Sequence, residues 1–119
     1  MAQSLVSHGE RGGVKNAWLD VAAAQTDAVL VAAEPGRKIV VIGVFANGKD
    51  AGASLLTFNS KGAGAGTAIS PIFDVAADGG FVMPQEHGGW FETIKGEALT
   101  ATTGAASATA LIVVYRMAA

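Results

Sequence analysis

The chain has 119 residues, with 8 Lys and Arg against 10 Asp and Glu and a formal net charge of −2. This length fits one domain, and the near-neutral charge argues against a nucleic-acid-binding protein, which usually has a basic stripe. The absence of cysteine excludes a disulfide framework, a thiolate metal site and a cysteine nucleophile. Because 24 residues are Ala and 16 are Gly, we expect a thin core that is stabilised in part by partner subunits.

The first 13 residues are polar and end in two glycines, which predicts an N-terminal arm over residues 1–13 and a domain over residues 14–119. The arm lacks the apolar core of a signal peptide, and no stretch approaches the roughly 18 apolar residues of a membrane span. Leu5 and Val6 are the only apolar anchors of the arm. We expect them, with His8 and Arg11, to contact a partner surface, and a disordered terminus is the alternative.

The segment from residue 14 to residue 33 is compatible with two structures. Its alanines allow a helix over residues 19–33, whereas Thr26, Val29 and Val31 favour strands. Strands are preferred here. Pro35 and Gly36 then suit the two central positions of a type II turn, which predicts a change of direction before the next element.

Short apolar segments alternate with turn signals from residue 38 to the end of the chain. Asn47 and Gly48 predict a turn, and Pro71 indicates an edge position or a bulge. The spacing of about 8–12 residues, without a sustained helical period, predicts an antiparallel β-sandwich or barrel of seven or eight short strands. The expected strands lie in segments 27–31, 38–45, 54–58, 67–75, 81–83, 90–93, 97–102 and 109–115.

Two segments, 39–45 and 110–115, are apolar without alternation, which predicts that both faces of these strands are covered. The opposite sheet can cover one face. A second subunit is the preferred cover for the other, and the loop around Trp90 is the alternative. The predicted oligomer interface consists of Ile39, Val41, Val113 and Tyr115.

Trp90 and Phe91 form the most distinctive aromatic pair of the sequence. We expect them to act as a loop plug over the open end of the sandwich. The alternative is an exposed aromatic platform for a sugar, which requires ring faces in contact with solvent.

The side chains that could carry chemistry are few and scattered. One of the two histidines falls in the arm, so a metal site with several histidine ligands is not expected. Glu86 and His87 could hold a cation with Asp78, but loop carboxylates are usually only solvated. No nucleophile elbow, phosphate-binding loop or dinucleotide fingerprint is present. Glu92 and Glu97 flank strands rather than a deep cleft, so we expect no enzyme, no cofactor and no metal.

A series of segments can be compared with known families. It comprises VLVAAEPGRKI (29–39), LTF (56–58), ISP (69–71), AADGG (76–80), GWFET (89–93), GEAL (96–99) and IVVY (112–115). In this order the series resembles small β-sandwich structural proteins of tailed bacteriophages, many of them jelly-roll decoration (cement) proteins of capsids. The resemblance covers about residues 25–117 and excludes the arm.

The resemblance implies a jelly-roll-like sandwich that is a non-enzymatic part of the virion, made in the bacterial host cytoplasm. The expected location is the outer surface of the phage head, with the major capsid protein as partner. The expected assembly is a homo-oligomer, with a trimer favoured and a dimer possible, and without contact to nucleic acid or membrane. A receptor- or carbohydrate-binding module of a tail fibre or baseplate is the main alternative, and a small enzyme built around His87 is another.

Overall fold

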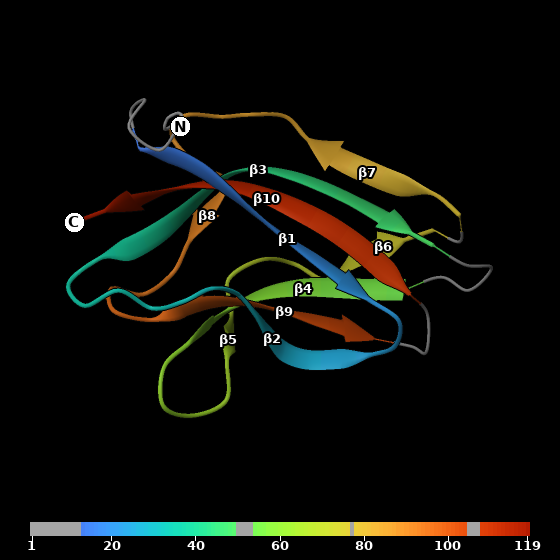
Figure 1. Ribbon diagram of the computed structural model, residues 1–119, viewed down its shortest axis with the longest axis horizontal. Coiled ribbons are helices and arrows are strands. Elements are labelled where there is room, and N and C mark those ends of the chain that lie inside the picture. The colour runs from blue at the N-terminus through green and yellow to red at the C-terminus, as the bar shows by residue number, and fades with distance from the viewer. Residues whose placement is uncertain (1–12, 50–53, 77, 105–107) are drawn as a thin grey trace, which may run out of the picture.

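The computed structural model of the chain describes residues 13–49, 54–76, 78–104 and 108–119. These residues form two antiparallel five-stranded sheets that pack face to face as a β-sandwich, as expected (Figure 1). The described residues contain no helix, and hence none long and apolar enough to cross a membrane. The predicted arm contacts Leu5, Val6, His8 and Arg11 lie outside the described residues.

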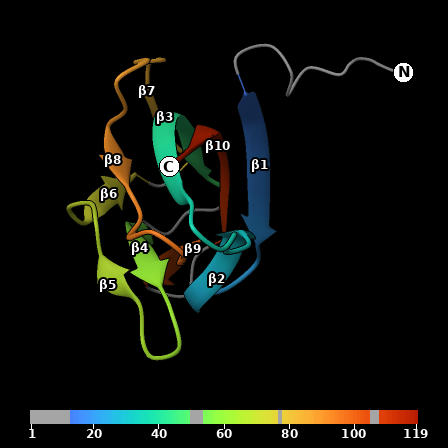
Figure 2. The same ribbon diagram turned by 90° about the vertical axis from the view of Figure 1, so that its left-hand side faces the viewer.

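Sheet A has the strand order β1-β10-β3-β7, and β8 also pairs with β3. In Figures 1 and 2 this sheet is the upper layer of the sandwich. Its strands are β1 (Val14–Val21), β3 (Lys38–Gly48), β7 (Gly80–Met83), β8 (Phe91–Glu92) and β10 (Thr109–Ala118).

Sheet B has the strand order β2-β9-β4-β5, and β6 also pairs with β4. Its strands are β2 (Gln25–Val31), β4 (Ser54–Lys61), β5 (Thr67–Ala68), β6 (Phe73–Val75) and β9 (Ala98–Gly104). The alternative helix over residues 19–33 is therefore wrong, because β-branched residues pack well on a pleated surface. The predicted edge position of Pro71 agrees with the structure. Pro71 lies between β5 and β6, two short strands at the edge of sheet B that pair with β4 alone.

The two predicted turns have different outcomes. The turn at Pro35 and Gly36 is confirmed, because the Arg37 amide donates to the Glu34 carbonyl over 3.1 Å and Gly36 has a φ of 74°. The turn at Asn47 and Gly48 is wrong, since β3 continues through both residues. There the Gly48 amide donates to the Gly79 carbonyl over 2.8 Å, so tertiary pairing overrides the local turn preference.

The core lies between the sheets and consists mainly of aliphatic side chains. Phe58 on β4 is its largest fully buried side chain. The Phe58 ring packs on Phe91 at a centroid distance of 5.1 Å and on Phe73 at 6.4 Å. The buried cluster comprises Ile39, Val41, Val44, Ala46, Leu56, Phe58, Val75, Leu99, Ala101, Leu111 and Val113.

The central strand β3 is covered on both faces from residue 39 to residue 44, entirely by its own chain. A register shift opposite Val114 and Tyr115 marks a bulge in its pairing with β10. Before the bulge Ile39 and Val41 point into the core, and after it Val44 and Ala46 do, so the inward positions shift from odd to even residue numbers. This shift removes the regular alternation from the sequence. Along the edge of β3 between β7 and β8, the Glu86 and Trp90 amides donate to the carbonyls of Ile42 and Val41 over 2.7 and 2.8 Å, and Gly89 lies against the Val40 side chain.

The predicted oligomer interface is corrected by this packing. Ile39, Val41 and Val113 are fully buried in the core between the two sheets. Their side chains contact the opposite sheet rather than a second subunit, so the interface prediction is wrong for these three residues. Tyr115 is only partly buried and packs against the edge of the core. Burial, and then the negative charge of Glu34, raise the pKa of the Tyr115 phenol.

Truncation of Phe58 tests the core. We expect Phe58→Ala to lower the free energy of unfolding by about 3–5 kcal/mol, because a large cavity opens between the sheets. Leu55→Ala is the matched control, since Leu55 lies on the same strand and is 44% exposed, and its effect should stay within about 1 kcal/mol. Urea unfolding of both variants measures the difference, and equal effects would contradict this description of the core.

Candidate functional site

The described residues contain no group of three or more His, Asp or Glu that could hold a metal ion. His87 is exposed, and its backbone carbonyl accepts a hydrogen bond from Arg116 Nε over 3.3 Å. Glu92 pairs with Lys38 over 2.8 Å, and Glu97 accepts from the Ser60 hydroxyl over 2.7 Å. Each glutamate is therefore bound to its own local partner, as a structural carboxylate is.

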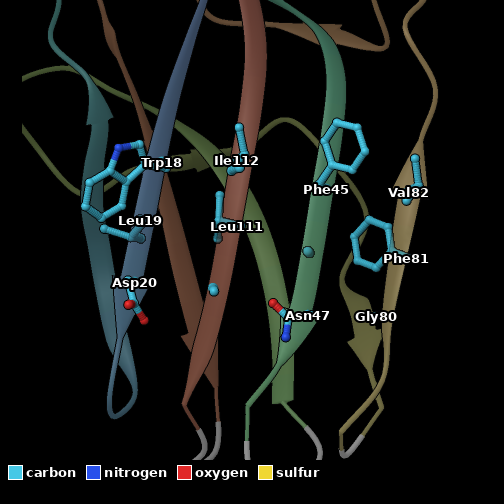
Figure 3. Close-up of a pocket in the computed structure, with 12 residues that line it drawn as sticks. Trp18, Leu19, Asp20, Phe45, Asn47, Gly80, Phe81, Val82, Leu111 and Ile112 are labelled. Carbon is cyan, nitrogen blue, oxygen red and sulfur yellow. The ribbon is translucent and has the colours of Figure 1, made fainter.

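The most distinctive surface feature is a row of large apolar side chains on the outer face of sheet A. Trp18 on β1 is opposite Ile112 on β10, Ile112 is opposite Phe45 on β3, and Phe45 is opposite Val82 on β7. We call these four residues the apolar row. Figure 3 shows them at one level across four neighbouring strands. Directly opposed residues on neighbouring strands lie in contact distance, so the row forms one continuous surface.

All four side chains of the apolar row are unusually exposed for large hydrophobic residues. The exposed fractions are 71% for Trp18, 43% for Ile112, 49% for Phe45 and 58% for Val82. Single exposed hydrophobic residues are normal on a protein surface, whereas contiguous ones mark an interaction site.

A shallow groove of about 650 Å³ runs along the apolar row between β1 and β7. The next outward-facing positions toward one end of the strands are Asp20, Ala110, Asn47 and Gly80, which are paired in register with one another. Asp20 forms an ion pair with Lys49. The rim of the groove therefore carries small or polar side chains, and its nearest carboxylate is already neutralised by a lysine.

The structure separates the two residues of the predicted loop plug. Phe91 packs against the core and stacks on Phe58. Trp90 is half-exposed, and its indole N–H donates to the Pro84 carbonyl over 2.8 Å. This bond ties the two ends of segment 84–90 together beside β3.

A partly buried polar network anchors sheet B on the opposite side of the molecule. The Asp27 carboxylate accepts hydrogen bonds from the Gly66 amide, the Thr100 hydroxyl and the Asn59 side-chain amide, over 3.0, 3.0 and 3.1 Å. The Gly66 bond is the largest cause that holds the pKa of Asp27 below its ordinary value of 3.8. A side chain at Gly66 would collide with this carboxylate. The network ties β2, β4, β9 and the loop after β4 together, and its role is structural.

The apolar row was not identified from the sequence, although two of its members lie in the unbroken apolar segments. Phe45 and Ile112 are the exposed residues of those segments, and Trp18 and Val82 belong to neighbouring strands. Only the register between strands brings the four together, and register is not visible in one sequence. An alternating segment with a large exposed aromatic, such as Asn16-Ala17-Trp18-Leu19-Asp20, was the available signal.

No protein-family model matches this chain, and no curated protein is significantly similar to it in sequence.

The Asp27 network predicts a pH dependence of stability. A carboxylate whose pKa is lower in the folded state than in the unfolded state stabilises the folded protein. The stabilisation is complete at pH values above the unfolded pKa, and it is lost as the pH falls through the folded pKa. We expect Asp27→Asn to be less stable than the wild type at pH 7, with a difference that shrinks below the ordinary pKa of 3.8. Urea unfolding of both proteins at pH 7 and at a pH below 3.8 measures this difference in the free energy of unfolding. A difference that does not change with pH would contradict the role of the Asp27 charge.

Proposed function

We propose that this chain is a non-enzymatic structural protein of a phage particle, a decoration protein that binds the outer surface of the head as a homo-oligomer. The observation that supports it most is the apolar row, a contiguous exposed surface without a cluster of reactive side chains beside it. Such a surface suits association with another protein face. A catalytic site requires converging polar groups of perturbed pKa in a cleft.

The strand order supports the fold expected for this role. Consecutive long strands alternate between the sheets, so that β1, β3 and β10 are neighbours in sheet A while β2, β4 and β9 are neighbours in sheet B. We infer that this arrangement is a jelly roll, a double sheet that protein shells use. The resemblance of segments 29–39 through 112–115 to phage decoration proteins points to the same role.

The proposed mechanism is mechanical. An oligomer that bridges neighbouring major capsid subunits adds contact area that opposes the outward pressure of packed DNA. The net charge of −2 suits a protein that does not touch DNA. In this proposal the N-terminal segment with Leu5, Val6, His8 and Arg11 contacts the capsid, and several copies per oligomer compensate for the ordering entropy of each segment.

A carbohydrate-binding module of a tail fibre or baseplate is the second candidate, because Trp18 presents a largely exposed aromatic ring beside polar Asp20. Binding of soluble glycans that is lost in Trp18→Ala would favour this candidate. Capsid binding without glycan binding would favour the decoration protein.

Imaging of virions tests the proposed function directly. We expect density for this chain on the outside of the head, and capsids to which the purified protein binds should withstand higher temperature than bare capsids, because bound protein stabilises the state it binds. Deletion of residues 1–13 should reduce capsid binding. Heads without this chain on their surface would overturn the proposal, and unchanged binding after the deletion would overturn the role of the N-terminal segment.

A further inference from the structure

We infer that the apolar row is the surface through which two copies of this chain pair, face to face, about a two-fold axis parallel to the strands of sheet A. The inference deepens the proposed function, since it rests on the homo-oligomer and names the surface that forms it. Three properties of the described residues support a second copy as the occupant: area, local charge and the order of side-chain sizes.

The exposed area of the apolar row is suited to a dimer. Its four side chains expose roughly 400–500 Å² of apolar surface, the upper range of what monomeric proteins carry. Two such faces bring together roughly twice this area, and the flanking residues extend it toward the 1,200–2,000 Å² that stable interfaces bury. The β-sheet face also allows close approach, because Ala110 and Gly80 beside the row are small.

The local charge is also compatible with a second copy. A surface with net charge repels its own copy across a two-fold axis, because like charges then meet. The apolar row contains no charged side chain, and the nearest carboxylate, Asp20, is neutralised by Lys49. The other polar side chains that flank the row are uncharged, Asn16 on β1 and Asn47 on β3. Pairing therefore buries no uncompensated charge.

The order of side-chain sizes fits one particular symmetry. Across the sheet the apolar row reads Trp18, Ile112, Phe45, Val82, so that aromatic and β-branched side chains alternate. A two-fold axis parallel to the strands reverses the strand order of the facing copy. It places Trp18 opposite the second copy's Val82, and Ile112 opposite the second copy's Phe45. Each aromatic ring then meets a smaller aliphatic side chain, which is the complementarity that close packing requires.

The first test is the mass of the protein in solution. By light scattering at micromolar concentration we expect a species of twice 11.9 kDa. Ile112→Lys should weaken the dimer by at least about 100-fold, because each copy then buries a lysine ammonium without a counter-charge in an otherwise apolar interface. Leu55→Lys is the matched control, since Leu55 is 44% exposed and Ile112 is 43% exposed, but Leu55 lies on sheet B. The control should remain dimeric, and thermal unfolding should show that both variants fold.

The second test concerns the orientation of the two copies. The chain has no cysteine, so single cysteines report only the designed contact. A mixture of Trp18→Cys and Val82→Cys should form a disulfide between the two variants faster than either variant forms one with itself. Faster self-linking of Trp18→Cys would overturn the proposed axis, because that result places β1 of one copy over β1 of the other.

Other occupants of the apolar row have distinct outcomes, and each of them overturns the inference. A monomer that loses capsid binding in Ile112→Lys assigns the row to the capsid protein and leaves the proposed function standing. A monomer that binds glycans through Trp18 assigns the row to a sugar. A monomer that becomes an Ile112-dependent dimer on deletion of residues 1–12 assigns it to the chain's own N-terminal segment. A dimer that is absent from virions overturns the proposed function alone.

Discussion

The packing of residues 84–90 along the edge of β3 is the interaction on which the surface of this molecule depends. It places Gly89 against the Val40 side chain and is held by backbone hydrogen bonds to Val41 and Ile42 and by the Trp90 indole. These contacts reach only the first half of β3. Beyond the bulge the strand is open, and Phe45 faces solvent together with its neighbours on β1, β10 and β7. One strand thus contains both a closed core segment and the centre of an exposed apolar surface.

The sequence was sufficient for the fold class because strand signals and turn signals recur along most of the chain. The β-branched residues of β3 and β10, and Pro35 with Gly36 after β2, follow rules that act over a few residues. The first strand, β1, was not among the expected strands. Asn47 and Gly48 show where local rules end, since tertiary hydrogen bonding keeps them within β3.

The interacting surface was harder to predict, for a physical reason. The unbroken apolar segments predicted two covered faces, which is correct for residues 39–44 but wrong for segment 110–115, where Ile112 is exposed. The pattern also did not distinguish burial by another subunit from burial within the chain. The bulge in β3 then reversed which residues point inward, so Ile39 and Val41 were assigned to the wrong side. A single inserted residue moves every later side chain to the other face, and no pattern within one strand reveals it.

The loop between β4 and β5 has a practical consequence. Its two ends are fixed, by the Lys61 ammonium on the Gly64 carbonyl and by the Gly66 amide on Asp27, whereas a side chain at Gly64 would meet no atom within 4 Å. This loop extends from sheet B, away from β1 and β7 (Figures 1 and 2). A short peptide inserted at Gly64 would project into solvent without disturbing the apolar row, which makes this loop a natural attachment point for an epitope tag or a label.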